Sequence, residues 1–231
     1  MTQARQHQLT VLSITAAIAV IAVLIAIVLS NTQPASATDA DFNNIPQEHL
    51  DNGGFILGDP NAPIIIVEFA DFLCPHCQRY KSTINQIIEE HVANGQARLE
   101  FRMLPTQQGS DNLFKLAECI DQTEESNFWE AHDELFALAA NSTDRNDIGR
   151  ISAENLGVSY AEILQCTDDL TRSNSGQYLT DSSLSGPAGV TGTPAIRVRL
   201  GGSDAPMQAV FNTLPSFDAI SEVILAANAQ P

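Results

Sequence analysis

The fold of this chain is decided by the stretch IIIVEFADFLCPHC, residues 64–77. Residues 64–70 form a continuous apolar and mostly β-branched run, which is typical of a central strand whose two faces are both covered. After the CPHC motif at 74–77, apolar and aromatic residues recur at helical spacing over residues 80–92, until Asn94-Gly95 ends the pattern. The stretch therefore predicts a strand, a tight turn carrying two cysteines, and a helix.

The rest of the chain completes an α/β fold around this stretch. Residues 97–104 alternate enough to form a second strand, and a strand reached through a helix runs parallel to the first. Further elements are expected as helices near 113–120, 128–138, 147–156, 160–165 and 170–184, a hairpin of 195–200 with 207–211, and a helix over 217–227. This order predicts an α/β fold with a helical insertion at about 106–187. Its CPHC turn lies at the carboxyl end of a strand, where such sheets place their sites.

The N-terminal segment is expected to carry the domain out of the cytoplasm. Residues 11–29 are uncharged and long enough as a helix to span roughly 28 Å of hydrocarbon, which predicts a membrane anchor within residues 1–30. The small residues at 35–37 leave a cleaved signal segment as the alternative. Arg5 precedes the run and acidic residues follow it, so the N-terminus is expected on the cytoplasmic side. A polar linker at 31–47 and a folded domain at 48–231 follow.

The composition narrows the classes of function. The chain has 231 residues, of which 44% are hydrophobic, so a folded domain is expected. Its 11 Lys and Arg against 28 Asp and Glu give a formal charge of −17, which would repel phosphate backbones. Nucleic-acid binding is therefore excluded as an interpretation.

The spacing of the CPHC cysteines suits redox chemistry. Cysteine attacks disulfides as the thiolate, and the first turn of a helix stabilises a negative charge there, so Cys74 is the expected nucleophile. Pro75 fits the first helical position because it lacks an N–H, and His76 adds a nearby cation. Cys77 lies one turn further on, where it can close a disulfide. Half of a zinc site and a purely structural bridge are the alternatives.

The segment 68–77 resembles the active-site segment of the DsbA-like thiol-disulfide oxidoreductases. The resemblance covers about residues 50–228 and includes Gly58-Asp59-Pro60, Ala117-Glu118-Cys119, Phe128-Trp129, His132 and the run GVTGTPA at 189–195. It implies a thioredoxin fold interrupted by a helical insertion. It also implies that Cys74 is the attacking cysteine and Cys77 the resolving one.

The resemblance assigns roles to two further positions. Glu68 matches a buried acid beneath the disulfide that relays a proton to or from Cys77, although a carboxylate at an exposed strand end is an equal alternative. Pro194 matches a cis-proline packed against the CPHC turn. Thr193 would then offer main-chain groups to an extended substrate peptide by strand addition.

Two cysteines remain outside the motif. In an oxidising compartment leftover cysteines tend to pair, and some members of the resembled family carry a second bridge, so we expect a disulfide between Cys119 and Cys166. Two buried free thiols are the alternative.

Together these observations predict an extracytoplasmic thiol-disulfide oxidoreductase, on the periplasmic or outer side of a membrane, that introduces disulfides into exported polypeptides. No cofactor beyond the redox-active Cys74–Cys77 pair and no metal are expected. The resemblance implies a quinone-linked membrane protein as the partner that reoxidises the site. Thr193 also occurs in reductase and isomerase branches of the wider family, so the reverse direction stays open, as does a metal-binding or holdase module.

Overall fold

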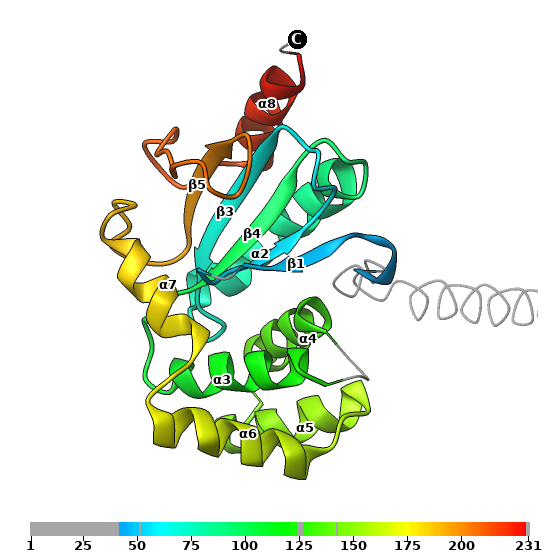
Figure 1. Ribbon diagram of the computed structural model, residues 1–231, viewed down its shortest axis with the longest axis vertical. Coiled ribbons are helices and arrows are strands. Elements are labelled where there is room, and N and C mark those ends of the chain that lie inside the picture. The colour runs from blue at the N-terminus through cyan, green and yellow to red at the C-terminus, as the bar shows by residue number, and fades with distance from the viewer. Residues whose placement is uncertain (1–41, 51, 124–126, 142, 230–231) are drawn as a thin grey trace, which may run out of the picture. The chain divides into compact units, whose positions relative to one another are not determined.

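The computed structural model describes residues 42–229 except 51, 124–126 and 142 (Figure 1). The expected membrane anchor at 11–29 and most of the expected linker lie outside the described residues. Among those that are described, no helix combines the length and apolarity needed to cross a bilayer.

Phe42 opens the short 3₁₀ helix η1 (Phe42–Asn44) and is only 5% exposed. The linker predicted at 31–47 therefore ends earlier than expected, because Phe42 joins the core.

A five-stranded sheet organises the domain. Its strands are β1 (Gln47–His49), β2 (Phe55–Leu57), β3 (Ile64–Ala70), β4 (Arg98–Met103) and β5 (Ala195–Leu200), in the order β1-β2-β4-β3-β5. β3 and β4 run parallel and the other neighbours antiparallel, which confirms the two predicted central strands and their direction. The sequence patterns did not predict β1 and β2, because each has only three residues and shows no usable periodicity.

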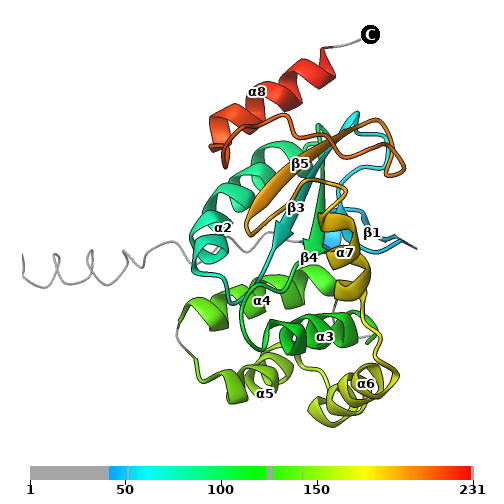
Figure 2. The same ribbon diagram turned by 90° about the vertical axis from the view of Figure 1, so that its left-hand side faces the viewer.

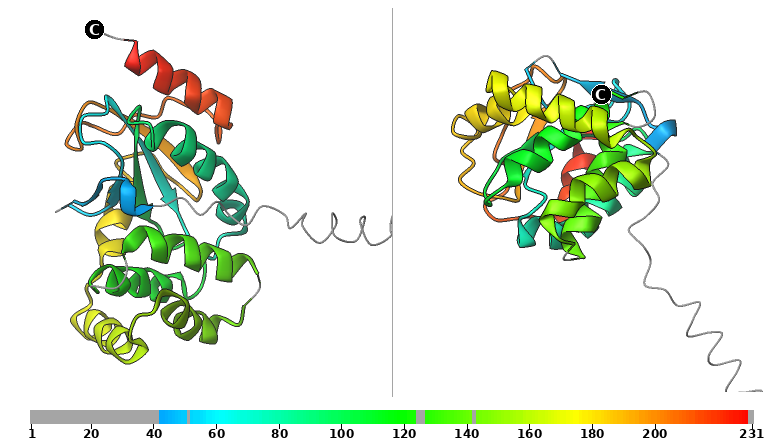
Figure 3. Two further views of the ribbon diagram at one scale, coloured as in Figure 1. Left: turned by 90° about the vertical axis from the view of Figure 1, so that its right-hand side faces the viewer. Right: turned by 90° about the horizontal axis from the view of Figure 1, so that it is seen from below.

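Helices cover one face of the sheet. The CPHC motif opens α2 (Pro75–Ile87), which continues through a π-helical turn, η2 (Ile88–Val92), and α8 (Phe217–Asn228) packs beside α2 and against β3 (Figures 1 and 2). The remaining helices form the insertion: α3 (Ser110–Asp121), α4 (Phe128–Ala140), α5 (Arg145–Leu156), α6 (Tyr160–Ser173) and α7 (Gln177–Ser185). Helices α3 to α6 pack against one another below the sheet, as the view from below also shows, while α7 lies beside β4 (Figure 3). The predicted α/β fold with a helical insertion is thus confirmed.

Two predicted elements are wrong in detail. The helix expected over 170–184 is broken, because Asn174 ends α6 in the left-handed conformation (φ 49°) and Gly176 (φ 142°) precedes α7. The second hairpin strand at 207–211 is reduced to one bridge between Val198 and Gln208. Pro206 has no N–H to donate to a ladder there, which limits pairing to that bridge.

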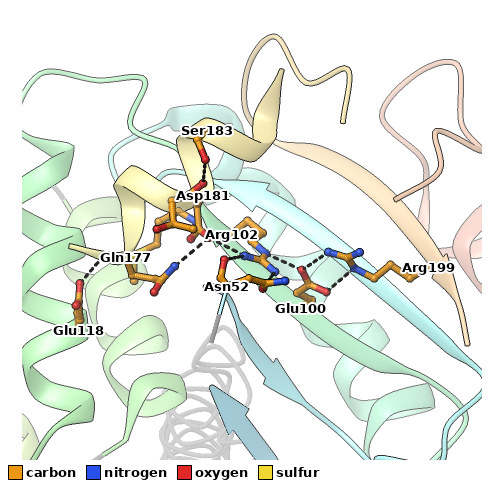
Figure 4. A network of polar contacts seen from close by, with 10 residues as sticks. Asn52, Glu100, Arg102, Glu118, Gln177, Asp181, Ser183 and Arg199 are labelled. Carbon is orange, nitrogen blue, oxygen red and sulfur yellow. Dashed lines mark hydrogen bonds and ion pairs between the residues drawn. The ribbon is translucent and has the colours of Figure 1, made fainter. Parts of the chain in front are cut away.

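The alternation of side chains along the central strands decides what lies under the CPHC turn. On β3, residues 64, 66 and 70 join the core that also holds Cys77, and residues 65, 67 and 69 join a smaller cluster on the opposite face. Because side chains alternate, Glu68 faces the first core. On β4 the same alternation sends Glu100 and Arg102 to the opposite face, where they form a buried ionic network (Figure 4).

Candidate active site

The two cysteines of the CPHC motif start helix α2. Cys74 is the N-cap residue with extended backbone angles (φ −75°, ψ 119°), and Pro75 occupies the first helical position, as its missing N–H predicts. Cys74 is 4% exposed and Cys77 is completely buried, and both are free thiols. The helix therefore places one sulfur at the surface edge of the core and the other inside it.

The loop before β5 meets this turn across the fold. The Thr193–Pro194 peptide bond is cis, as the family resemblance implied. The Cys74 thiol donates a hydrogen bond to the Thr193 carbonyl over a sulfur–oxygen distance of 3.5 Å. The structure thus brings together two segments 119 residues apart in the chain, both of which were expected at the site.

The two thiols differ in acidity. Burial by itself raises the pKa of Cys74, but hydrogen bonds from the Thr193 side chain, from Cys77 and from the His76 backbone outweigh it, and the pKa is lowered overall. Burial and the nearby Glu68 carboxylate raise the pKa of Cys77 far above its ordinary value. Cys74 is therefore the more acidic of the two thiols, and Cys77 stays protonated near neutral pH.

His76 acts differently from the expectation. Its ring is exposed and its Nδ1 lies 2.9 Å from a guanidinium nitrogen of Arg79, so the ring is engaged along the helix surface. The contribution of His76 to the acidity of Cys74 comes from its backbone N–H. The expected cation beside the sulfur is thus replaced by a backbone donor, because the ring turns toward Arg79.

Glu68 is buried below the turn. It is 1% exposed, and its Oε2 atom has no hydrogen-bond partner among the described residues. Burial raises the pKa of Glu68 to about 7, against a smaller opposing effect of the Lys81 ammonium. Of the two interpretations, the exposed strand end is therefore wrong, and Glu68 is a carboxyl group that exchanges its proton near neutrality.

Lys81 begins a polar chain that the sequence patterns did not reveal. Its ammonium lies 2.8 Å from Asp133 in α4, and Asp133 in turn lies 2.9 Å from the buried ring of His132. Burial lowers the pKa of His132 to about 4, so this ring is neutral at physiological pH. One signal was available: Lys81 follows Cys77 by four residues, on the helix face that is otherwise apolar.

Asp71 joins two segments of the chain through its carboxylate. It is fully buried, and its carboxylate accepts hydrogen bonds from the backbone N–H groups of Leu73, Thr106 and Gln107 and from the hydroxyls of Thr106 and Ser110, at 2.7 to 2.9 Å. The carboxylate fastens the segment before Cys74 to the segment that follows β4. Apart from Leu73, nothing local in the sequence indicates these partners, because Thr106, Gln107 and Ser110 lie 35 to 39 residues away.

Cys119 and Cys166 are joined by a disulfide between α3 and α6, with a Cα–Cα distance of 5.9 Å. This is the pairing that the resemblance implied. A zinc site at the CPHC turn would need these two cysteines, and they are bonded to each other instead.

The sheet order, the two-cysteine turn at a helix start and the cis-proline loop beside it define a thioredoxin-like fold of the DsbA type. The chain belongs to the thioredoxin family, because the family model described as Thioredoxin matches residues 51–205.

Curated relatives and solved structures give the same picture. The chain is 23% identical over 175 residues to "Disulfide bond formation protein D" of Bacillus subtilis, covering 73% of this chain and 74% of that protein. It is 31% identical over 90 residues to "Probable disulfide bond formation protein D" of Bacillus anthracis, where the match spans 42% of the relative's length. Wolbachia pipientis alpha-DsbA1 superposes with a TM-score of 0.63 at 21% identity, covering 77% of this chain and 92% of that one. Oxidised BdbD of Bacillus subtilis superposes with a TM-score of 0.60 at 21% identity, covering 74% of this chain and 91% of that one.

Proposed function

We propose that this protein is a thiol-disulfide oxidoreductase that introduces disulfides into exported polypeptides. The observation that carries the proposal is the opposite acidity of the two CPHC thiols, with the pKa of Cys74 lowered and that of Cys77 raised, beside a cis-proline loop. A structural pair of cysteines has no need of such a difference. The names of the Bacillus relatives, which are disulfide bond formation proteins, agree with this activity.

The reaction runs through a mixed disulfide. A substrate thiolate attacks the Cys74 sulfur of the Cys74–Cys77 disulfide, and Cys77 leaves as a thiolate that takes up a proton. A second substrate thiolate then attacks the substrate sulfur of the mixed disulfide, and Cys74 leaves. The substrate gives up two electrons and gains a disulfide, while the protein ends with two thiols.

Glu68 supplies the proton for the buried leaving group. A Cys77 thiolate inside the core beside an ionised Glu68 would place two negative charges together in a medium that solvates neither. With its pKa at about 7, Glu68 can hold a proton before the step and release it as Cys77 leaves. The two charges are then never present at once.

The substrate peptide would bind along the cis-proline loop. A groove of about 370 Å³ adjoins Pro194 and is lined by residues of the loop 189–195, the start of β5 and the segment 211–214. Within the described part of the chain, β5 is an edge strand whose second side is paired at a single bridge, so an extended peptide could add alongside its first residues. Backbone pairing of this kind favours broad acceptance of unfolded clients.

Turnover as an oxidase requires an acceptor for the two electrons. We place the domain on the extracytoplasmic side of a membrane, tethered by the apolar segment 11–29, with a quinone-linked membrane protein as the reoxidising partner. That location also supports an oxidised Cys119–Cys166 bridge, because such bridges persist in oxidising compartments.

The second candidate function is a disulfide reductase or isomerase that uses the same two cysteines. Thr193 favours it, because reductase and isomerase branches of the wider family share a threonine at this position. The reduction potential of the Cys74–Cys77 pair tests the direction. A value near about −120 mV, that of a strong protein oxidant, supports the oxidase, and one near about −270 mV, that of thioredoxin, supports the reductase. A Cys74→Ser protein that still exchanged disulfides, or that kept a stoichiometric metal in place of exchange, would contradict both directions.

A further inference from the structure

Two threonines, Thr106 and Thr193, connect the buried Asp71 to the Cys74 sulfur. The Thr106 hydroxyl donates to the Asp71 carboxylate at 2.9 Å, and the hydroxyl oxygens of Thr106 and Thr193 lie 3.0 Å apart. Thr193 in turn contacts Cys74 through its carbonyl at 3.5 Å and through its side chain. Thr106 is thus one hydrogen bond removed from the group that lowers the pKa of the reactive thiol.

The direction of the hydrogens in this row follows from counting donors. The groups around Asp71 are backbone N–H groups and hydroxyls, and each donates to one of its two carboxylate oxygens. A hydroxyl has a single hydrogen, and Asp71 takes that of Thr106. The contact between the two threonines therefore has Thr193 as donor and Thr106 as acceptor.

Thr193 cannot serve two acceptors with one hydrogen. While Cys74 is a thiol, it donates its own hydrogen to the Thr193 carbonyl and leaves the Thr193 hydroxyl to Thr106. When Cys74 ionises, its sulfur becomes an acceptor, and the Thr193 hydroxyl can serve it only by turning away from Thr106. The other groups that face the Cys74 sulfur are the Cys77 thiol and the backbone N–H groups of His76 and Cys77. The Thr193 side chain also hydrogen-bonds to Cys77, whose pKa is raised by burial.

We propose that Thr106 is a positioning residue that competes with the Cys74 sulfur for the hydroxyl hydrogen of Thr193, and so limits how readily Cys74 ionises. Because the Thr106 hydroxyl donates its hydrogen to Asp71, its oxygen can only accept a hydrogen bond from Thr193. The inference rests on the proposed function only in taking Cys74 as the attacking cysteine. In physical terms, Thr106 restrains the oxidising strength of the site, since a stabilised thiolate stabilises the reduced form.

The test is the Thr106→Val substitution in the full chain. Valine keeps the shape of threonine and leaves the backbone N–H of residue 106 on Asp71 at 2.7 Å, but removes the acceptor. The pKa of Cys74 is read from the ultraviolet absorbance of the thiolate, with the oxidised protein as blank. Because a net hydrogen bond is worth about 0.5–1.5 kcal/mol, the acid dissociation constant of Cys74 is expected to rise between about two- and tenfold.

Three controls separate this effect from general loosening. Thr106→Ser keeps the hydroxyl and is expected to retain the wild-type pKa. Ser110→Ala removes another hydrogen bond to the same Asp71 carboxylate without touching Thr193, and is expected to leave the pKa of Cys74 unchanged. In a Thr193→Val protein, the added Thr106→Val change is expected to have no effect, because the contested hydrogen is already gone.

The equilibrium with glutathione gives a second readout. Reduced protein plus glutathione disulfide yields the Cys74–Cys77 disulfide plus two glutathione thiols, and Thr106→Val is expected to shift this balance toward the reduced protein by up to about tenfold, or about 30 mV. An unchanged or raised pKa in Thr106→Val, an equal shift in Ser110→Ala, or a shift that persists without the Thr193 hydroxyl would each overturn the inference. None of these results bears on whether Cys74 is required for exchange, which Cys74→Ser decides separately.

Discussion

Asp181 in helix α7 forms an ion pair with Arg102 in strand β4, with 2.9 Å between Oδ1 and Nη1 and both side chains fully buried (Figure 4). Asp181 also accepts a hydrogen bond from the Met103 backbone at 2.8 Å. Arg102 continues the network to Glu100 at 2.6 Å, and Glu100 reaches Arg199 of β5 at 2.9 Å. A connected set of buried charges therefore fastens the helical insertion to the sheet whose strands carry the active site.

Removing Arg102 should loosen this connection. We expect Arg102→Met to lower the free energy of unfolding by about 3–5 kcal/mol near pH 7.5, because Asp181 would remain buried without its cation. Burial already raises the pKa of Asp181 to about 6 and Arg102 opposes that rise, so the variant's Asp181 should stay protonated to higher pH. The deficit should accordingly shrink near pH 5, where Asp181 is largely protonated in both proteins.

Urea unfolding at the two pH values measures this difference. Arg150→Met is the matched control, because Arg150 pairs with Asp147 and Glu154 on an exposed helix surface and should cost less than about 1 kcal/mol. If Arg102→Met and Arg150→Met lost the same free energy of unfolding, the buried ion pairs would stabilise the fold no more than the exposed ones do.

Glu68→Gln should change how stability depends on pH. The pKa of Glu68 is raised from 4.5 to about 7 in the folded protein, so between those values the folded state holds a proton that the unfolded state has lost. Stability from this group is therefore present below pH 4.5 and is lost as pH rises to 7, by about 3 kcal/mol. The glutamine variant cannot ionise and should lack that loss, which makes it more stable than the wild type above pH 7.

The rate of thiol-disulfide exchange tests the proposed proton transfer from Glu68 to Cys77. If Glu68 protonates the leaving Cys77, the wild-type rate of opening the Cys74–Cys77 disulfide should fall as pH rises through 7, once the falling fraction of protonated Glu68 limits the step. Glu68→Gln should be slower at pH 6 and should not show this fall. A variant with the wild-type pH profile would remove Glu68 from the proton transfer.

Cys77→Ser should trap the intermediate. The Cys74 thiolate attacks a peptide disulfide and releases one peptide thiolate, leaving a mixed disulfide that Cys77 normally resolves by closing the Cys74–Cys77 bond. Without Cys77 this adduct should accumulate, and mass spectrometry under non-reducing conditions should place it on Cys74. Cys74→Ser is the control and should form no adduct, because the pKa of the buried Cys77 is raised far above neutrality.

The sequence predicted those parts of the site that are encoded over short distances. The run 64–70, the CPHC motif and the helical spacing after it are each readable within a few residues, and they gave the parallel strands, the start of α2 and the roles expected of Cys74 and Cys77. Pro194 needed the resemblance, because an X-Pro bond taken alone is cis in only about 5–6% of cases.

The missed features all depend on partners that are far apart in the chain. Asp71 reads locally as a turn residue, yet its hydrogen bonds reach residues 106–110. Asp181 lies in a segment rich in serine and asparagine, and only the packing of α7 on β4 brings it to Arg102, 79 residues away. Glu68 could not be placed from its strand alone, since burial depends on which helix covers that face.

The disulfide between Cys119 and Cys166 should support the insertion without setting the chemistry of the site. It closes a loop of 47 residues between α3 and α6, and the chain-entropy model then gives about 4 kcal/mol of stability. The double variant Cys119→Ala/Cys166→Ala should therefore lose up to about 4 kcal/mol in urea unfolding. Replacing both cysteines avoids a leftover thiol that could exchange with the CPHC pair.

The reduction potential of Cys74–Cys77 distinguishes support of the fold from control of the site. The Cys74 sulfur is governed by Thr193, Cys77 and the His76 backbone, none of which belongs to α3 or α6, so the double variant should keep the wild-type potential. Reducing the wild-type bridge at 119 and 166 should reproduce the stability loss of the variant. A large change in potential with unchanged unfolding would mean that the insertion disulfide acts on the active site rather than on the stability of the helices.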